Sequence, residues 1–326
     1  MAGLIWCLIG LATLVAGSEL LVRQGTKLAI LAGIPPIVIG LTVVAVGTSA
    51  PELAIGIEAA LLGKGSLAVG NVAGTNILNI LLILGLSAWL LPMPIDMRVL
   101  RHDLPAMVVA ATILVVMAAD GVLTRFEGMV LVLGAIAYTI GTILSTRRER
   151  PRVKAEFERE FAEETAAARV RDMSGIVVSF LLLAVSIAVV VKGADWLVYG
   201  ASDLARSLGV SDAFIGLTVV AIGTSSPELV TMIVATLRGE RDIAIGNVIG
   251  SSTYNILAIL GTTALVPGNG IAVEPDLIRI DIPISALAAL ACIPIFLTSR
   301  RVTRIEGALF VCAYLAYLTY LVIVRG

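Results

Sequence analysis

Charged residues are scarce in this chain of 326 residues. Asp, Glu, Lys and Arg make up 14% of it, against about 25% in a typical globular protein. Apolar residues reach 58%, and the mean hydropathy is +1.01. This composition excludes a soluble domain and predicts a polytopic membrane protein. The formal net charge of −1 says nothing about partners, because the information lies in where the charges are placed.

Histidine and cysteine are also scarce. The one histidine, His102, falls in a polar loop, which argues against metal or nucleophilic chemistry based on histidine. The cysteines Cys7, Cys292 and Cys312 lie in apolar runs without pairing or metal-ligand spacing, so we expect small core residues and no disulfide framework. An intramembrane hydrolase is disfavoured, because no apolar segment carries a histidine or a serine–lysine pair. We expect no enzymatic activity and no cofactor.

Apolar segments of membrane-spanning length recur along the chain. The first, MAGLIWCLIGL and its continuation, lacks a basic leader and exceeds the length of a signal peptide, so we interpret it as a span and not as a cleaved leader. A bilayer core needs about 20 apolar residues per helix. Ten segments meet this requirement, at residues 3–30, 36–60, 66–90, 103–119, 126–145, 174–205, 212–236, 243–265, 280–298 and 305–323.

Residues 146–173 depart from this pattern. They carry eight Lys or Arg and seven Asp or Glu residues in 28 positions, a density found nowhere else in the chain. We expect a solvated, partly helical linker between a first five-helix repeat, residues 1–145, and a second, residues 174–326. The predicted fold is all-α, with ten transmembrane helices in two repeats.

The two predicted halves are copies of each other. GLTVVAVGTSAPEL at 40–53 returns as GLTVVAIGTSSPEL at 216–229, and GNVAGTNILNILLILG at 70–85 returns as GNVIGSSTYNILAILG at 246–261. Since five is an odd number of spans, the second copy must be inverted in the membrane. Such repeats are typical of secondary transporters, whose sites lie near the midplane between the repeats.

The basic residues predict the orientation. Seventeen of the 23 Lys and Arg residues fall in the linker and in the other loops and span ends on its side of the membrane. By the positive-inside bias, we expect the linker in the cytoplasm and both termini outside, in an inner (plasma) membrane of the prokaryotic type.

A proline and a glutamate interrupt the second span. Pro51 has no N–H and crowds the Gly47 carbonyl, so the helix should break there and free backbone oxygens at mid-membrane. Such oxygens are tolerated where protein, water or a ligand satisfies them. Thr48, Ser49 and Glu52 surround the break, and the second copy repeats it with Gly223, Thr224, Ser225, Pro227 and Glu228.

Two carboxylates in the membrane interior suggest a bound cation or proton, because each costs at least about 2.5 kcal/mol at the bilayer centre. With hydroxyl, amide and carbonyl oxygens they suit Ca²⁺ better than Mg²⁺, which retains its waters.

The following spans add polar stripes at helical spacing. We favour a ligand role for Thr75, Asn79, Ser251 and Asn255, and leave open whether Asn71 and Asn247 bind an ion or join helices. The pairs Gly70 with Gly74 and Gly246 with Gly250 should let these spans pack on the broken helices.

The duplicated GTSxPEL and GNVxG motifs on this repeat pattern resemble the cation/calcium exchanger superfamily, and most closely prokaryotic sodium/calcium exchangers. The resemblance covers nearly the full length. It implies that Glu52 and Glu228 are the central carboxylates, with flanking oxygens from further residues. These are the side chains or backbones of Thr48, Ser49, Thr224 and Ser225, the backbone carbonyls of Ala45 and Ala221, and the side chains of Thr75, Asn79, Ser251 and Asn255.

The predicted function is a Ca²⁺/Na⁺ antiporter working by alternating access. H⁺/Ca²⁺ exchange is the alternative, and a cation channel is disfavoured because the twofold is internal to one chain. We expect a monomer in the lipid bilayer, with Ca²⁺ and Na⁺ as transported ions and no nucleic-acid partner. Asn255 stands where some members carry aspartate, which predicts a cage of charge −2 without a requirement for K⁺.

Two further acidic residues, Glu19 and Asp195, are related by the repeat. Arg23 follows Glu19 by four residues and Lys192 precedes Asp195 by three, so we expect an ion pair within each helix. Their long spans, the first and the sixth, resemble the sliding gate helices of the superfamily.

Overall fold

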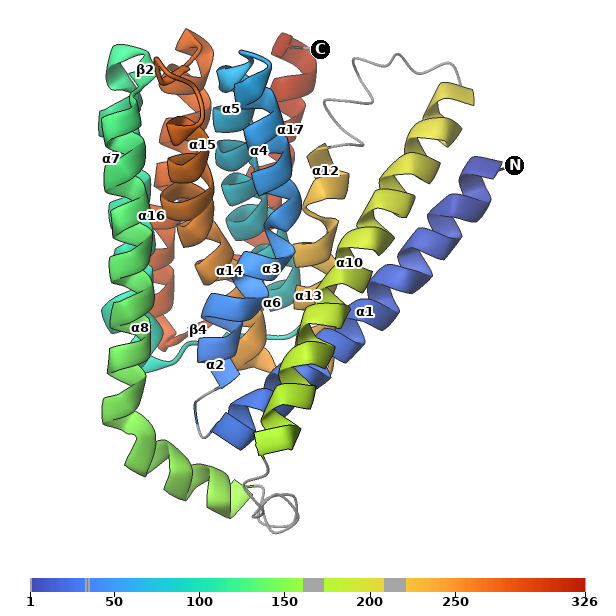
Figure 1. Ribbon diagram of the computed structural model, residues 1–326, viewed down its shortest axis with the longest axis vertical. Coiled ribbons are helices and arrows are strands. Elements are labelled where there is room, and N and C mark those ends of the chain that lie inside the picture. Colours follow the sequence, from blue (N-terminus) through green and yellow to red (C-terminus); the bar gives the residue numbers. More distant parts are fainter. Residues whose placement is uncertain (1, 33, 35, 161–172, 208–220, 326) are drawn as a thin grey trace.

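Helices form almost all of the described part of the protein, shown in Figure 1 as a computed structural model. The structure describes residues 2–32, 34, 36–160, 173–207 and 221–325. Within these residues, eight helices are long and apolar enough to cross a membrane, or nine if one bent pair counts as a span. The predicted span at 212–236 lies partly outside the described residues, so the number ten stays a prediction. The fold is that of a polytopic helical membrane protein.

The first half alternates long helices with broken ones. Several helices contain π-helical segments, in which hydrogen bonds join residues five apart. The elements are α1 (Ala2–Ala32), α2 (Pro36–Ile39), π-helical η1 (Gly40–Val44), α3 (Ala45–Thr48), α4 (Ala50–Leu61), α5 (Gly65–Ile77), π-helical η2 (Leu78–Leu84), α6 (Gly85–Leu90), β1 (Met93–Pro94), π-helical η3 (Val99–Asp103), α7 (Leu104–Met117), 3₁₀-helical η4 (Ala118–Asp120), β2 (Val122–Leu123) and α8 (Arg125–Glu160). Helix α8 runs on from the predicted fifth span, so residues 146–160 are helical.

The second half follows the same order. Its elements are α10 (Met173–Ser207), α12 (Ala221–Thr224), α13 (Ser226–Leu237), α14 (Arg241–Tyr254), π-helical η6 (Asn255–Leu260), α15 (Gly261–Leu265), β3 (Ile271–Ala272), π-helical η7 (Leu277–Asp281), α16 (Ile282–Ser299), β4 (Arg301–Val302) and α17 (Arg304–Arg325). The π-helical segments η2 and η6 thus fall at equivalent places in the two copies.

Two small antiparallel sheets join the halves. Strand β1 pairs with β4, and β2 pairs with β3, so each sheet takes one strand from either half. In Figure 1 the strand β2 lies at the upper end of the molecule and its repeat equivalent β4 at the lower end. Equivalent connections therefore occupy opposite ends of the bundle.

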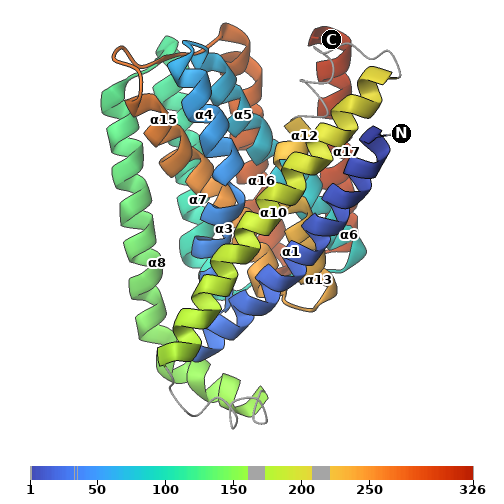
Figure 2. The same ribbon diagram turned by 45° about the vertical axis from the view of Figure 1, so that its right-hand side comes forward.

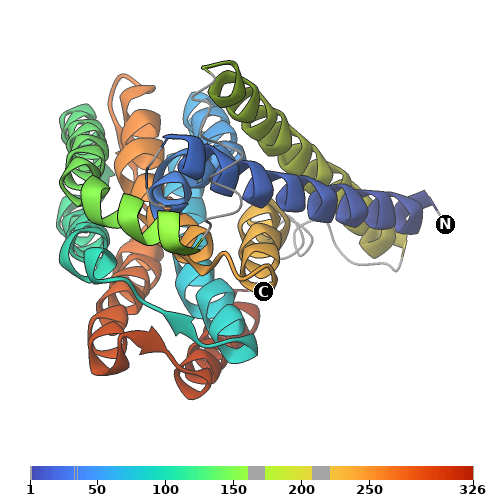
Figure 3. The same ribbon diagram turned by 90° about the horizontal axis from the view of Figure 1, so that it is seen from below.

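Helices α1 and α10 lie side by side and cross the rest of the molecule obliquely (Figures 1 and 2). They run in opposite directions, and from below they lie along one side of the bundle (Figure 3). Glycines permit their close approach. A Cβ atom at Gly10 would lie 2.3 Å from the backbone of Leu197, and one at Gly200 would lie 2.4 Å from the backbone of Cys7. The pair of long helices is thus held together backbone to backbone.

The most buried spans are the two that carry the polar stripes. Of an 18-residue apolar stretch in each span, 94% is buried in Arg241–Leu265 and 72% in Gly65–Leu90, against 17% in the peripheral span Arg304–Ile323. Gly246 and Gly250 pack as predicted against the first broken helix, since a Cβ at Gly250 would lie 2.7 Å from the Leu41 carbonyl oxygen. A Cβ atom at Gly74 would have no described neighbour within 4 Å. The described residues therefore do not support the predicted close packing at Gly74.

The cysteines only partly match expectation. All three are free, as expected. Cys292 is buried in the core, but Cys7 is half-buried and Cys312 is exposed on the outer surface of α17. The prediction that all three are core residues is therefore wrong for Cys312, because a helix that faces lipid accepts small apolar side chains on its outside as readily as on its inside.

Candidate functional site

Two helix breaks meet in the middle of the molecule. Helix α3 ends at Thr48 and α4 begins at Ala50, with a bend of 42° between the two helical stretches and φ −83°, ψ 11° at Ser49. The break predicted at Pro51 is therefore present. In the second half α12 ends at Thr224 and α13 begins at Ser226, and Ser225 has nearly the same dihedral angles, φ −89° and ψ 6°.

Each break presents its glutamate to the other half of the chain. Glu52 and Glu228 lie in the first turns of α4 and α13, and both are fully buried. The hydroxyl of Ser49 donates a hydrogen bond to Glu228 Oε1 at 3.1 Å, and the hydroxyl of Ser225 donates one to Glu52 Oε1 at 3.5 Å. The serine of one break thus bonds to the carboxylate of the other, which brings both carboxylates into one buried site.

Hydroxyl groups extend this site toward the neighbouring helices. Thr75 Oγ1 lies 3.3 Å from Ser225 Oγ. The Ala45 carbonyl accepts hydrogen bonds from Thr48 Oγ1 and from Ser251 Oγ, both at 3.4 Å. Ser251 is fully buried, so this carbonyl faces a polar interior and not the lipid.

Asn247 has a joining role in this structure. Its Oδ1 lies 3.2 Å from Thr48 Oγ1 and competes with the Ala45 carbonyl for the one hydroxyl proton, a contact that ties α14 to the first broken helix. Of the two roles left open for this residue, the described contacts therefore show the one that connects helices.

Four oxygens of the site have no hydrogen-bonding partner in the described part of the chain. They are Oε2 of Glu52, Oε2 of Glu228, Oδ1 of Asn79 and Oδ1 of Asn255, and all are buried. Buried polar atoms without partners are rare, and each calls for an explanation. Unpartnered carboxylate and amide oxygens around two negative charges match the ligand preference of a hard cation.

The predicted site residues are distributed as follows. Direct hydrogen bonds form three groups, which are Ser49 with Glu228, Ser225 with Glu52 and Thr75, and Ala45 with Thr48 and Ser251. Thr224 is buried next to Ser225 in the sequence, and Asn79 and Asn255 are buried four residues after Thr75 and Ser251. Ala221 is the first residue of α12, and the residues before it lie outside the described part. The described residues contain no group of three or more His, Cys, Asp and Glu side chains suited to a metal, so the charge of this site comes from the two glutamates.

The sequence interpretation missed Asn76. This residue is 2% exposed and bonds both to Asn255 and to the backbone of Ser252. It lies next to Thr75, outside the stripe of residues spaced by four, and its repeat equivalent is a serine. A search for polar residues shared by both copies therefore could not single it out.

The prediction for Glu19 is wrong. Its carboxylate pairs with Arg238 at the end of α13, and not with Arg23 on its own helix, because α1 passes close to the other half of the chain. The prediction for Asp195 is confirmed by a distance of 3.4 Å to Lys192. Beside Glu19, the hydroxyls of Ser18 and Thr231 lie 3.2 Å apart in a buried contact, so α1 is tied to α13 twice.

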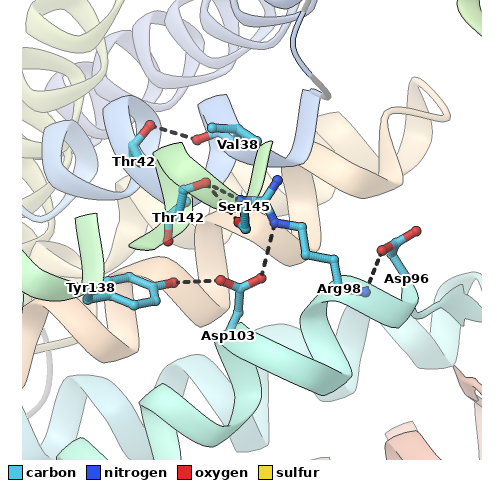
Figure 4. Close-up of polar contacts among 8 residues, drawn as sticks. All are labelled: Val38, Thr42, Asp96, Arg98, Asp103, Tyr138, Thr142 and Ser145. Atoms are coloured by element: carbon cyan, nitrogen blue, oxygen red, sulfur yellow. Dashed lines mark hydrogen bonds and ion pairs between the residues drawn. The ribbon is translucent and has the colours of Figure 1, made fainter. Parts of the chain in front are cut away.

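A second buried polar cluster, shown in Figure 4, lies outside this site. Tyr138 donates to Asp103 Oδ1 at 3.2 Å, and Arg98 lies 4.0 Å from Asp103 Oδ2 while donating to the Thr142 carbonyl at 2.6 Å. These residues connect η3 with α8. The arginine balances the aspartate charge, so the cluster is suited to holding helices together and not to binding a cation.

Comparison with known proteins identifies the family of this chain. A family model described as "Sodium/calcium exchanger protein" matches residues 2–144 and 178–323. The chain is 33% identical to a sodium/calcium exchanger of Methanosarcina acetivorans over 96% of this chain and 97% of that protein. It is 37% identical to the inner membrane protein YrbG of Escherichia coli over 80% of this chain and 79% of that protein.

Solved structures of sodium/calcium exchangers have the same fold as this chain. The sodium/calcium exchanger from Methanococcus jannaschii superimposes with a TM-score of 0.81 at 28% identity, over 97% of this chain and 96% of that chain. A structure of the sodium-calcium exchanger NCX_Mj soaked with Na⁺ and Ca²⁺ gives 0.83 over 98% and 99% of the two chains. The protein is therefore a polytopic integral membrane transporter that belongs to the sodium/calcium exchanger family.

Proposed function

We propose that this protein exchanges Ca²⁺ for Na⁺ by alternating access, and that the ions bind between Glu52 and Glu228. The observation that carries the proposal is the reciprocal pair of serine–carboxylate hydrogen bonds between the two helix breaks. It joins two buried carboxylates, each with an oxygen that has no hydrogen-bonding partner among the described residues, into one site shared by both halves. Two negative charges match one Ca²⁺, and Na⁺ ions can replace it at the same oxygens.

The serine hydroxyls give this site a means of adapting to its ion. In the structure they donate to the carboxylates. A hydroxyl rotates about its C–O bond and also carries two lone pairs, so Ser49 and Ser225 can offer oxygen to a cation when the carboxylates turn toward it. The remaining proposed ligands are the oxygens of Thr48, Thr75, Asn79, Thr224, Ser251 and Asn255 and the backbone carbonyls of Ala45 and Ala221.

Alternating access requires parts that move against each other around the fixed site. Helices α1 and α10 lie along one side of the bundle, so we assign the moving part to this pair (Figure 3). Glycine contacts join the two helices to each other. Movement of the pair as a unit would open the site to one face of the membrane at a time. Transport involves no covalent chemistry and no resident cofactor, and one chain is sufficient.

The proposed orientation has both termini outside the cell and residues 146–173 in the cytoplasm. Both termini lie toward the upper end of Figure 1, whereas α8, which leads into the basic segment 146–173, ends at the lower end. Single cysteines at Lys64 and at Lys154, in a background without the three native cysteines, should react with an impermeant thiol reagent from opposite faces. Labelling of both from one face would contradict the orientation.

The decisive test of function compares two driving forces. Purified protein in liposomes should take up ⁴⁵Ca²⁺ when a Na⁺ gradient is imposed, and an imposed pH gradient of equal size should drive no uptake. Uptake driven by the pH gradient alone would instead support H⁺/Ca²⁺ exchange through protonation of the two glutamates. With two negative charges at the site, exchange should also proceed when choline replaces K⁺.

A further inference from the structure

Asn76 lies at the interface of the two most buried spans, close to the proposed ion site. It belongs to α5, is 2% exposed, and follows Thr75 directly. Its amide bridges two groups of the opposite half. Asn76 Nδ2 donates to the Ser252 carbonyl at 2.9 Å, and Asn76 Oδ1 accepts from Asn255 Nδ2 at 3.0 Å.

The donors and acceptors in this chain of bonds permit one orientation. A backbone carbonyl can accept but cannot donate, so the Asn76 atom facing Ser252 must be the NH₂ group. The other end of the Asn76 amide is then its oxygen, which can only accept. Asn255 must therefore turn its own NH₂ group toward Asn76, and its Oδ1 points away from this bond, buried and without a hydrogen-bonding partner in the described residues.

The repeat equivalents lack this arrangement. Asn79 corresponds to Asn255, and neither its Nδ2 nor its Oδ1 has a hydrogen-bonding partner in the described residues. The residue equivalent to Asn76 is Ser252, whose shorter side chain makes no such bond there. One of the two asparagines of the site thus has a fixed amide orientation, and the other does not.

We infer that Asn76 is a positioning residue, which fixes the Asn255 amide so that its oxygen, and not its NH₂ group, serves as a cation ligand. The inference rests on the proposed function, because it takes Asn255 as part of the ion site. An amide turned the other way would direct hydrogen-bond donors at the cation and repel it. Asn76 therefore contributes to cation affinity without contacting the ion.

The test measures equilibrium Ca²⁺ binding to the full-length protein in detergent for three variants. Asn76→Leu keeps the side-chain volume but removes both bonds, and we expect binding to weaken at least about tenfold. Asn76→Asp keeps an oxygen that accepts from Asn255, so its binding should weaken no more than about threefold. The matched control is Thr253→Val, which removes a buried hydroxyl bonded to Ile249 within α14 and should leave binding unchanged.

A double-mutant cycle separates positioning from packing. In an Asn255→Leu background the amide to be oriented is gone, so adding Asn76→Leu should change Ca²⁺ binding less than about twofold. A merely structural Asn76 would weaken binding equally in both backgrounds. Such a result, or an Asn76→Asp variant as weak as Asn76→Leu, would overturn the inference. Should Asn76→Leu not fold, Asn76→Ala removes the same two bonds and takes its place.

Glu52→Gln, measured alongside, separates this inference from the proposed function. If Glu52→Gln loses Ca²⁺ binding while Asn76→Leu binds like the wild type, the positioning role is wrong and the site stands. If Glu52→Gln still binds Ca²⁺ like the wild type, the proposed site itself is wrong.

Discussion

The two halves of the chain share their motifs but not their contacts. In the first half Glu19 reaches across to Arg238 of the other half, whereas its equivalent Asp195 bonds to Lys192 on its own helix. The position equivalent to Arg238 is Leu62, which cannot pair with a carboxylate. A duplicated sequence therefore gives related helices in unequal surroundings.

The two halves also differ in the polar clusters outside the proposed site. Both halves have a tyrosine that donates to an aspartate, Tyr138 to Asp103 at 3.2 Å and Tyr317 to Asp281 at 2.5 Å. A buried arginine, Arg98, accompanies the first pair, and the exposed Asp276 occupies its place in the second. At the proposed site, by contrast, the serine–glutamate bonds are reciprocal. Symmetry is thus retained in the serine–glutamate bonds of the site, whereas the contacts around them differ.

The largest effect on transport should follow from replacing either glutamate of the two reciprocal serine–glutamate bonds. Glu52→Gln and Glu228→Gln should each reduce Na⁺-driven Ca²⁺ uptake in liposomes below about a tenth of the wild type, because each removes one of two buried charges facing a divalent ion. The control is Glu58→Gln, which changes an exposed glutamate on the same helix as Glu52 and should leave uptake intact. Substantial uptake by both buried-site variants would show that the carboxylates do not form the site.

A smaller effect, on stability, should separate the two tyrosine–aspartate clusters. Arg98→Met removes one partner of an ion pair whose side chains are 2% and 0% exposed. Removing one partner of a buried pair costs about 3–5 kcal/mol, so the variant should unfold at a clearly lower temperature in detergent. Asp276→Asn, at the equivalent but exposed position, should unfold like the wild type. Equal melting temperatures for both variants would mean that Arg98 does not stabilise the first cluster.

The smallest effect should come from the exposed ion pair between α1 and α13. Arg238→Gln removes the partner of Glu19, and exposed pairs contribute about 0–1 kcal/mol, so the balance between transport states should shift at most about fivefold. Distances between spin labels at the exposed residues Leu11 and Leu237 would report this shift. Lys192→Gln breaks the pair within α10 and should leave these distances unchanged. A larger change with Lys192→Gln than with Arg238→Gln would reverse the comparison.

Much of the fold follows from one-dimensional features of the sequence. Apolar runs predict spans, and at nine of the ten predicted positions the described residues form eight long helices and one bent pair, within a few residues of the predicted bounds. The broken helix at Ser49 follows from the chemistry of Pro51 on its own chain segment. The candidate residues were found because the duplication marks them twice, as with Glu52 and Glu228.

Which residues touch each other was decided by the tertiary structure. Whether Ser49 bonds to Glu228, or Glu19 pairs with Arg238, depends on how helices far apart in the chain pack and at what height they meet, which no local pattern encodes. Asn76 shows this most clearly. Its role arises from a carbonyl of the opposite half, to which it donates, and from the Asn255 amide, whose NH₂ group donates to it. Hydropathy, proline and repetition act along the chain, whereas hydrogen-bond direction is fixed where separate helices meet.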